Sequence, residues 1–273
     1  MAKAYVDTTV LTDVLLKTGA VKDRALALLK AFDVTQLPVY AIKEFKRGPF
    51  AHFVWMHNKL ASTGSFTRSL AALHAMSRTP KRYTTSTALE ALVTAADSIG
   101  NQTNAALAAT YGADASLGSV LCAEYRLTLK RVIYSAWAKR RNITTDIVDP
   151  LSCYNEKEPY ENRGLIETKP TACDREESCC LATPLRARAE ELRKMKQAID
   201  DTKSARREDS KRAQALRFLL RKKEQLTDAM CRDLGDAVFV AFSPSDAVIL
   251  TTNTRDYLPL ANSIGKQVQT PTA

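Results

Sequence analysis

The first side chain whose type and place could do chemistry is Asp7. Residues 4–6 fit a short strand, and a helical pattern of apolar residues begins just after Asp7. The apolar period changes there from 2 to 3.6, which places Asp7 at the carboxyl end of a strand. Ligands of open α/β sheets bind at that edge, and a carboxylate there can hold a divalent metal ion. The alternative is a helix N-cap, because Asp and Thr are good caps. Taken alone, this stretch favours the cap.

A second acid is predicted near the same edge. Residues 35–39 form a short extended piece, because Pro38 disfavours helix for the residue before it. A helical pattern follows from Tyr40 and carries Glu44 in its first turns. If the two strands are parallel neighbours, Glu44 lies at the same end of the sheet as Asp7.

The composition is that of a globular protein with a basic bias. The chain has 273 residues, of which 45% are hydrophobic and 26% charged, enough for one large domain or two small ones. Its formal net charge of +10 favours a polyanionic partner, either nucleic acid or an anionic membrane surface. Charge alone puts nucleic acid modestly ahead.

Segment signals predict a cytoplasmic location. The N-terminal residues have no secretory pattern, and no apolar run approaches the ~18 residues of a membrane span. Six cysteines in such a chain are expected to be reduced thiols. Zinc held by the cysteines of one irregular stretch is a minor alternative, because no Cys-x₂-Cys pair occurs among them. These cysteines are Cys153, Cys173, Cys179 and Cys180.

The chain divides into three parts. Residues 1–60 have α/β texture, and so do residues 232–273, where a short helix (236–242), a buried strand (247–251) and a last helix (257–264) are expected. Residues 61–231 between them read as mainly helical. Within that part, residues 142–183 have no sustained period and are expected to form a long loop.

Read together, the two ends resemble one nuclease family. Residues 6–11 read VDTTVL and residues 42–44 read IKE; near the other end, residues 234–238 read LGDAV and residues 250–257 read LTTNTRDY. This order resembles the PIN domain, the fold of VapC-like toxin ribonucleases. The family opens with strand-Asp-Thr-Asn-Val-Leu, places a Glu on a later helix, and closes with an Asp-Ala motif and a Thr-x-Asn/Asp-x-x-Asp motif. The resemblance covers roughly residues 1–60 and 232–266.

The resemblance implies an α/β fold with a parallel sheet of about four strands flanked by helices, carrying residues 61–231 as a large helical insertion. It also implies a site that binds Mg²⁺ or Mn²⁺ and hydrolyses phosphodiester bonds, with 5′-phosphate and 3′-hydroxyl products. Its first three acids, the metal ligands, would be Asp7, Glu44 and Asp236. Its remaining positions would be Thr251, Asn253 and Asp256.

The implied function is an endoribonuclease, a toxin or defence effector with a small antitoxin-like inhibitor and a homodimeric state. Two features depart from the family pattern besides the insertion: Thr9 stands where Asn is usual, and Asn253 is an amide where many members have a carboxylate. The second favours a non-catalytic nucleic-acid-binding or scaffold protein on the same fold. A structure-specific DNA nuclease is a third reading.

Basic clusters in the middle part are the expected nucleic-acid contacts. Lys139, Arg140 and Arg141 have no acidic neighbour until Asp146, and Trp137 nearby could stack on a base. A second cluster contains Lys81 and Arg82. The usual meaning of such charge is a solvated helix face, so these assignments depend on the charges being exposed.

Overall fold

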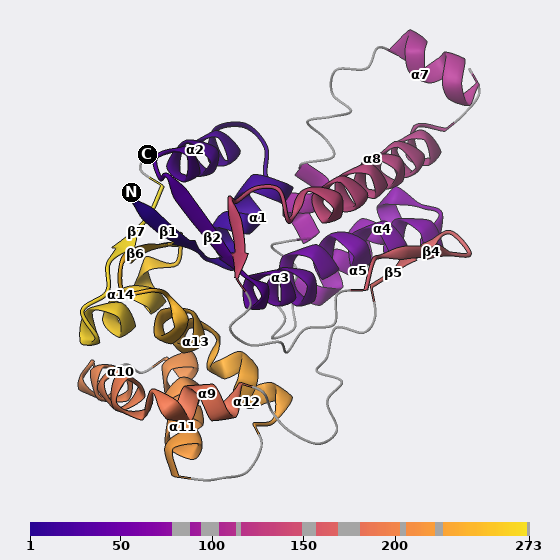
Figure 1. Ribbon diagram of the computed structural model, residues 1–273. Coiled ribbons are helices and arrows are strands. Elements are labelled where there is room, and N and C mark those ends of the chain that lie inside the picture. The colour runs from indigo at the N-terminus through magenta and orange to yellow at the C-terminus, as the bar shows by residue number, and fades with distance from the viewer. Residues whose placement is uncertain are drawn as a thin grey trace.

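A five-stranded parallel sheet forms the centre of the computed structural model (Figure 1). The strands lie in the order β3-β2-β1-β6-β7. The structure describes residues 1–77, 88–93, 104–112, 116–148, 157–168, 181–202, 206–221 and 226–271. The strands are β1 (Lys3–Val6), β2 (Val34–Pro38), β3 (Asp146–Val148), β6 (Ala247–Leu250) and β7 (Val268–Gln269).

The central strand joins the two ends of the chain. β1 pairs in parallel with β2 on one side and with β6 on the other, with Val6 opposite Leu250. Ala4 and Val6 are fully buried, as expected for a parallel strand covered on both faces. The carboxyl ends of β1 and β6 therefore lie side by side.

The α/β class and the parallel sheet flanked by helices are confirmed, but the strand count differs from the expected four. Edge strand β3 lies inside residues 142–183, which we expected to be a loop, and β7 has two residues. Strands this short carry no readable period, because alternation needs about four residues. Residues 142–183 also contain a hairpin of β4 (Tyr160–Asn162) and β5 (Leu165–Glu167).

The helices fall into two groups (Figure 1). The first group surrounds the N-terminal half of the sheet, and its long helix α8 packs on α4. It comprises α1 (Thr8–Leu16), α2 (Gly19–Lys30), α3 (Val39–Phe45), the π-helical turn η1 (Lys46–Phe50), α4 (Ala51–Thr63), α5 (Phe66–Ser77) and α8 (Leu117–Lys139), with α7 (Asn104–Tyr111) preceding α8.

The second group belongs to the C-terminal half. It comprises α9 (Ala182–Ala187), α10 (Ala189–Asp201), α11 (Arg207–Arg221), α12 (Asp228–Asp233), α13 (Gly235–Phe242) and α14 (Thr254–Ser263). α10 packs on α14 and on α11, so α11 is held close to the sheet edge that carries α13 and α14. Within the described ranges, no helix is both long and apolar enough to cross a bilayer.

The middle part of the chain is mainly helical where it is described, but it shares the core of the α/β part. β3 adds to the sheet, and Trp137 of α8 packs against Phe50 with ring centroids 5.3 Å apart. Buried residues of both parts belong to one hydrophobic cluster. The described residues of the range 61–231 therefore share one core with the two ends.

Candidate active site

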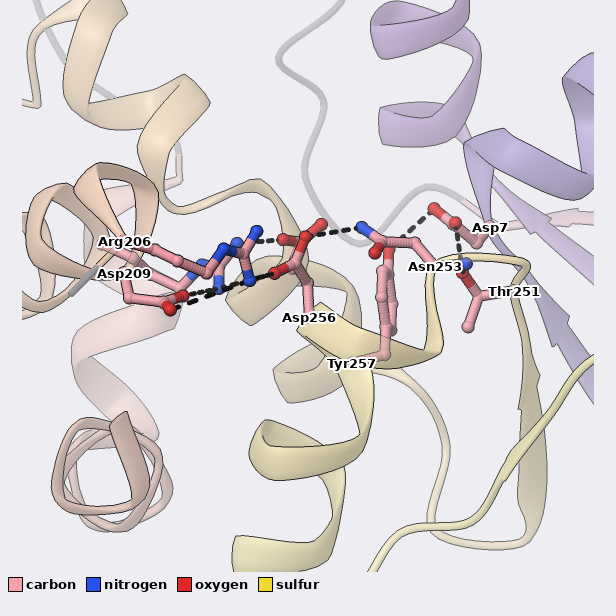
Figure 2. A network of polar contacts seen from close by, with 9 residues as sticks. Asp7, Arg206, Asp209, Thr251, Asn253, Asp256 and Tyr257 are labelled. Carbon is pink, nitrogen blue, oxygen red and sulfur yellow. Dashed lines mark hydrogen bonds and ion pairs between the residues drawn. The ribbon is translucent and has the colours of Figure 1, made fainter. Parts of the chain in front are cut away.

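The site begins where β1 and β6 end. The Asp7 amide donates to the Leu250 carbonyl oxygen (2.9 Å), which extends the β1–β6 pairing by one residue. Thr251, the residue after β6, therefore lies beside Asp7, and its hydroxyl donates to Asp7 Oδ2 at 2.7 Å (Figure 2). The parallel register thus brings together two residues that are 244 positions apart.

Asp7 is both the N-cap of α1 and a fixed carboxylate of the site. Its oxygens accept the backbone N–H groups of Thr8 (2.6 Å) and Thr9 (3.3 Å), the Thr9 hydroxyl (2.7 Å) and the Tyr257 hydroxyl (2.7 Å). Burial, followed by the charge of Asp7, raises the pKa of Tyr257 well above its usual value, so its hydroxyl keeps its proton. With the Thr251 bond, five donors hold a side chain that is 3% exposed.

Thr9, which stands where the family pattern usually has Asn, also holds Asp7 in place. Its hydroxyl donates to Asp7 and accepts the Thr252 backbone N–H at 3.0 Å. The hydroxyl therefore ties the start of α1 to the residues after β6. A threonine at this position fits a site in which Asp7 is positioned by hydrogen bonds.

Glu44 reaches the same place from α3. The Thr8 hydroxyl donates to Glu44 Oε2 at 3.0 Å. The other oxygen, Oε1, lies close to the Gly235 backbone: a Cβ on Gly235 would be only 2.5 Å from it. Gly235 therefore leaves the space that Glu44 occupies beside α13. The sequence shows this glycine directly before Asp236, but its role depends on a contact between helices that no local pattern predicts.

Asp236 stands in the first turn of α13 and forms an ion pair with Arg212 of α11. Burial first, and then the charge of Asp7, raise the pKa of Asp236 to about 6, although Arg212 opposes the shift. Burial, Asp7 and Asp236 together raise the pKa of Glu44 to about 8. The charge of Asp7 therefore acts on both Glu44 and Asp236, and a cation bound between these acids would relieve the repulsion.

Asn253, at the fourth position of the family pattern, is bonded to Asp256. The Asn253 amide donates to Asp256 Oδ2 (2.9 Å), and Arg206 donates to Asp256 Oδ1 (2.6 Å) (Figure 2). Burial alone would raise the pKa of Asp256, but the bond from Arg206 leaves it below its usual value. Asp256 lines a separate hollow with Arg206, Asp209 and Arg212. Asp256 is therefore not among the residues that line the cavity of the three acids.

The three acids line one cavity of about 440 Å³. Asn253 also lines it, and so does Asp13, whose pKa burial raises to about 6. Another part of the wall is basic, which gives the cavity a mixed character suited to a phosphate group bound together with a cation. The basic residues in the lining are Lys17, Lys43, Arg47 and Arg232.

The donor set fits a hydrated divalent ion. In the described parts of the chain, no three His, Cys, Asp or Glu side chains are gathered closely enough to hold an ion between them. Glu44 Oε1 and Asp236 Oδ1 nevertheless accept no hydrogen bond there, whereas both Asp7 oxygens are occupied. Mg²⁺ commonly binds through one or two carboxylates and keeps several waters. Glu44 and Asp236 could hold such an ion, with Asp7 reaching it through water.

The expected nucleic-acid cluster is partly hidden. Arg140 is 7% exposed; its guanidinium lies 3.8 Å from the centre of the Trp137 ring and donates to the Trp137 carbonyl oxygen. Trp137 is itself 3% exposed. Neither can contact a nucleic acid as predicted, because cation–π stacking and core packing use both side chains. Lys139 borders a separate groove with Lys22 and Lys30.

Other predicted residues lie outside the described ranges. They are Lys81, Arg82 and the cysteines Cys153, Cys173, Cys179 and Cys180. Cys122 and Cys231 are buried and form no disulfide among the described residues.

Comparison with known proteins adds no assignment. No family model matches this chain, and no curated protein or solved structure matches it. The parallel α/β fold is compatible with the PIN domain, and membership of that family stays a prediction from the motifs at the two ends.

Proposed function

We propose that this protein is a divalent-metal-dependent endonuclease that hydrolyses phosphodiester bonds, with RNA favoured over DNA. The observation that carries the proposal is the convergence of Asp7, Glu44 and Asp236 on one cavity. Asp7 follows β1, and Glu44 and Asp236 lie on α3 and α13. Burial first, and then the charges of Asp7 and Asp236, raise the pKa of Glu44. Perturbed pKa values of this kind, in a cavity lined by several acids, are typical of functional sites.

The residues have distinct roles in the proposed reaction. A bound Mg²⁺ or Mn²⁺ would supply charge neutralisation and an activated water. Glu44 and Asp236 would hold the ion, and Asp7 would fix the geometry through its bonds to Thr9, Thr251 and Tyr257. The water oxygen joins phosphorus and loses a proton, while the bond from phosphorus to O3′ breaks and O3′ gains one. The products are a 5′-phosphate and a 3′-hydroxyl.

The basic part of the wall supports an anionic substrate. Lys43 is 3% exposed yet lines the cavity, and Arg47 lines it while pairing with Asp228 at 2.6 Å. With a net charge of +10, the protein would attract a polyanion from a distance. A cytoplasmic location, an antitoxin-like inhibitor and a homodimer belong to the proposal through the sequence resemblance.

The test is cleavage of labelled single-stranded RNA and DNA and of a branched DNA duplex, with Mg²⁺ or Mn²⁺ and with EDTA. We expect RNA cleavage that EDTA abolishes and that Glu44→Gln lowers at least ~10²-fold, because a ligand of the ion is lost. Glu158→Gln is the matched control, since Glu158 is exposed. Cleavage by Glu44→Gln at the wild-type rate, or in EDTA, would contradict the metal mechanism. Cleavage of branched DNA alone would assign the structure-specific DNA nuclease.

A non-catalytic nucleic-acid-binding or scaffold protein is the second candidate. It is favoured by the fourth position, where Asn253 is neutral and Asp256 is engaged by Arg206. Binding of labelled RNA with a steep salt dependence, but without cleavage in either metal, would select it.

A further inference from the structure

Arg212 is a buried cation at the edge of the acid cluster. Its side chain is 8% exposed, and its guanidinium contacts three carboxylates: Asp236 directly, Asp209 at 3.4 Å and Asp256 at 3.9 Å. Its Nε is buried and has no hydrogen-bond partner among the described residues. An arginine on a helix usually extends into solvent. A buried arginine with several acidic partners therefore indicates a specific role for its charge.

The helix that carries Arg212 holds it firmly. Ala213, Leu216 and Leu219 of α11 are buried, and α11 packs against α10 and α12. Arg206 forms an ion pair with Asp256 and lies 3.7 Å from Asp209, so both acids are shared by Arg206 and Arg212. The guanidinium of Arg212 is therefore held in a defined place beside Asp236 and Asp209.

The same contacts engage carboxylate oxygens that could otherwise bind a second ion. One oxygen of Asp256 accepts a hydrogen bond from Arg206, and the other accepts one from Asn253. Asp236 Oδ2 is on Arg212, and both Asp7 oxygens accept hydrogen bonds. In two-ion sites, paired cations neutralise the charge of the attacking and leaving oxygens. Glu44 Oε1 and Asp236 Oδ1 accept no hydrogen bond among the described residues and could bind one ion, while the Arg212 guanidinium is paired with the other oxygen of Asp236.

We propose that the site takes one divalent ion and that Arg212 is a positioning residue, which fixes Asp236 and supplies the positive charge that a second ion would otherwise give. This inference rests on the proposed function. A preorganised charge of this kind stabilises the developing negative charge of a phosphodiester transition state without having to be recruited.

The experiment measures Mn²⁺ binding and RNA cleavage separately, by Mn²⁺ electron paramagnetic resonance and a labelled substrate. The proteins are the wild type, Arg212→Met, Arg212→Lys and the control Arg217→Met, because Arg217 is exposed on the same helix. We expect one Mn²⁺ per wild-type chain. Arg212→Met should bind Mn²⁺ at least as tightly, since a positive charge is removed, yet cleave at least tenfold more slowly. Arg212→Lys should restore part of the rate, and Arg217→Met should match the wild type.

Two Mn²⁺ ions per wild-type chain would overturn the inference. Faster cleavage by Arg212→Met would also overturn it, because Arg212 would then be an obstruction to the ion. Parallel loss of ion binding and cleavage would mean a merely structural role. One bound ion in a wild type that cleaves nothing would refute the proposed nuclease function and leave the ion count standing. If Arg212→Met does not fold, the ion count of the wild type and the rate of Arg212→Lys decide the question.

Discussion

Gly235→Ala should inactivate the site while the protein stays folded. A Cβ at this position would stand 2.5 Å from Glu44 Oε1, closer than two such atoms can approach. The obstructing atom is the tip of a flexible side chain, so the Glu44 carboxylate is expected to move and the backbone to stay. A displacement of ~1 Å in a catalytic group can cost ~10²-fold in rate. We expect a loss of that size in RNA cleavage, together with at least tenfold weaker Mn²⁺ binding.

Gly118→Ala is the control for this substitution. Gly118 also lies in the first turn of a helix, and a Cβ there would meet nothing within 4 Å. It should keep full activity and gain up to ~1 kcal/mol in unfolding free energy, because alanine is the better helix former. Wild-type cleavage by Gly235→Ala would show that the position of Glu44 beside α13 is not needed for activity.

Glu44→Gln should stabilise the metal-free protein at alkaline pH. Burial, Asp7 and Asp236 raise the pKa of Glu44 from 4.5 to about 8, so the folded protein keeps a proton that the unfolded chain releases. The stabilisation from this proton is complete below pH 4.5 and is lost as the pH rises through 8. Glutamine cannot ionise and escapes the loss. We expect the variant to gain ~2–4 kcal/mol over the wild type by pH 9, and little at pH 4.5.

Urea unfolding in EDTA between pH 4.5 and pH 9 measures this difference. Glu158→Gln should follow the wild-type curve at every pH, because Glu158 is exposed. Parallel curves for Glu44→Gln and the wild type would mean that Glu44 ionises in the folded state as an ordinary glutamate does. A gain in stability with a loss of cleavage would be typical of a site that holds like charges together for function.

The elements around the acids could be predicted because each has a strong local signal. The strand before Asp7 ends where the apolar period changes, Pro38 marks the end of the extended piece before Glu44, and the run 247–250 is a buried strand. The edge strands were missed because two or three residues cannot show alternation. The two interpretations of Asp7, as a helix N-cap and as a residue of the site, are compatible, because Asp7 both caps α1 and lines the cavity.

The partners of the acids could not be predicted, because they depend on how helices pack. Arg212 is one of many basic residues in the stretch 186–223, and nothing in its local pattern distinguishes it from exposed Arg217. Arg140 was misjudged for the same reason: a basic cluster at a helix end reads as surface, whereas stacking on Trp137 buries it. The sequence therefore indicated which acids lie together better than it indicated which basic side chains are exposed.

The measurement that tests the central claim most directly is the Mn²⁺ affinity of Glu44→Gln and Asp236→Asn. The account predicts one ion bound by the wild type and at least tenfold weaker binding by each variant, although the two positions are 192 residues apart in the chain. Asp23→Asn and Glu158→Gln, both at exposed positions, should bind as the wild type does. Wild-type affinity in either Glu44→Gln or Asp236→Asn would show that these two carboxylates do not share a cation, and would contradict the account.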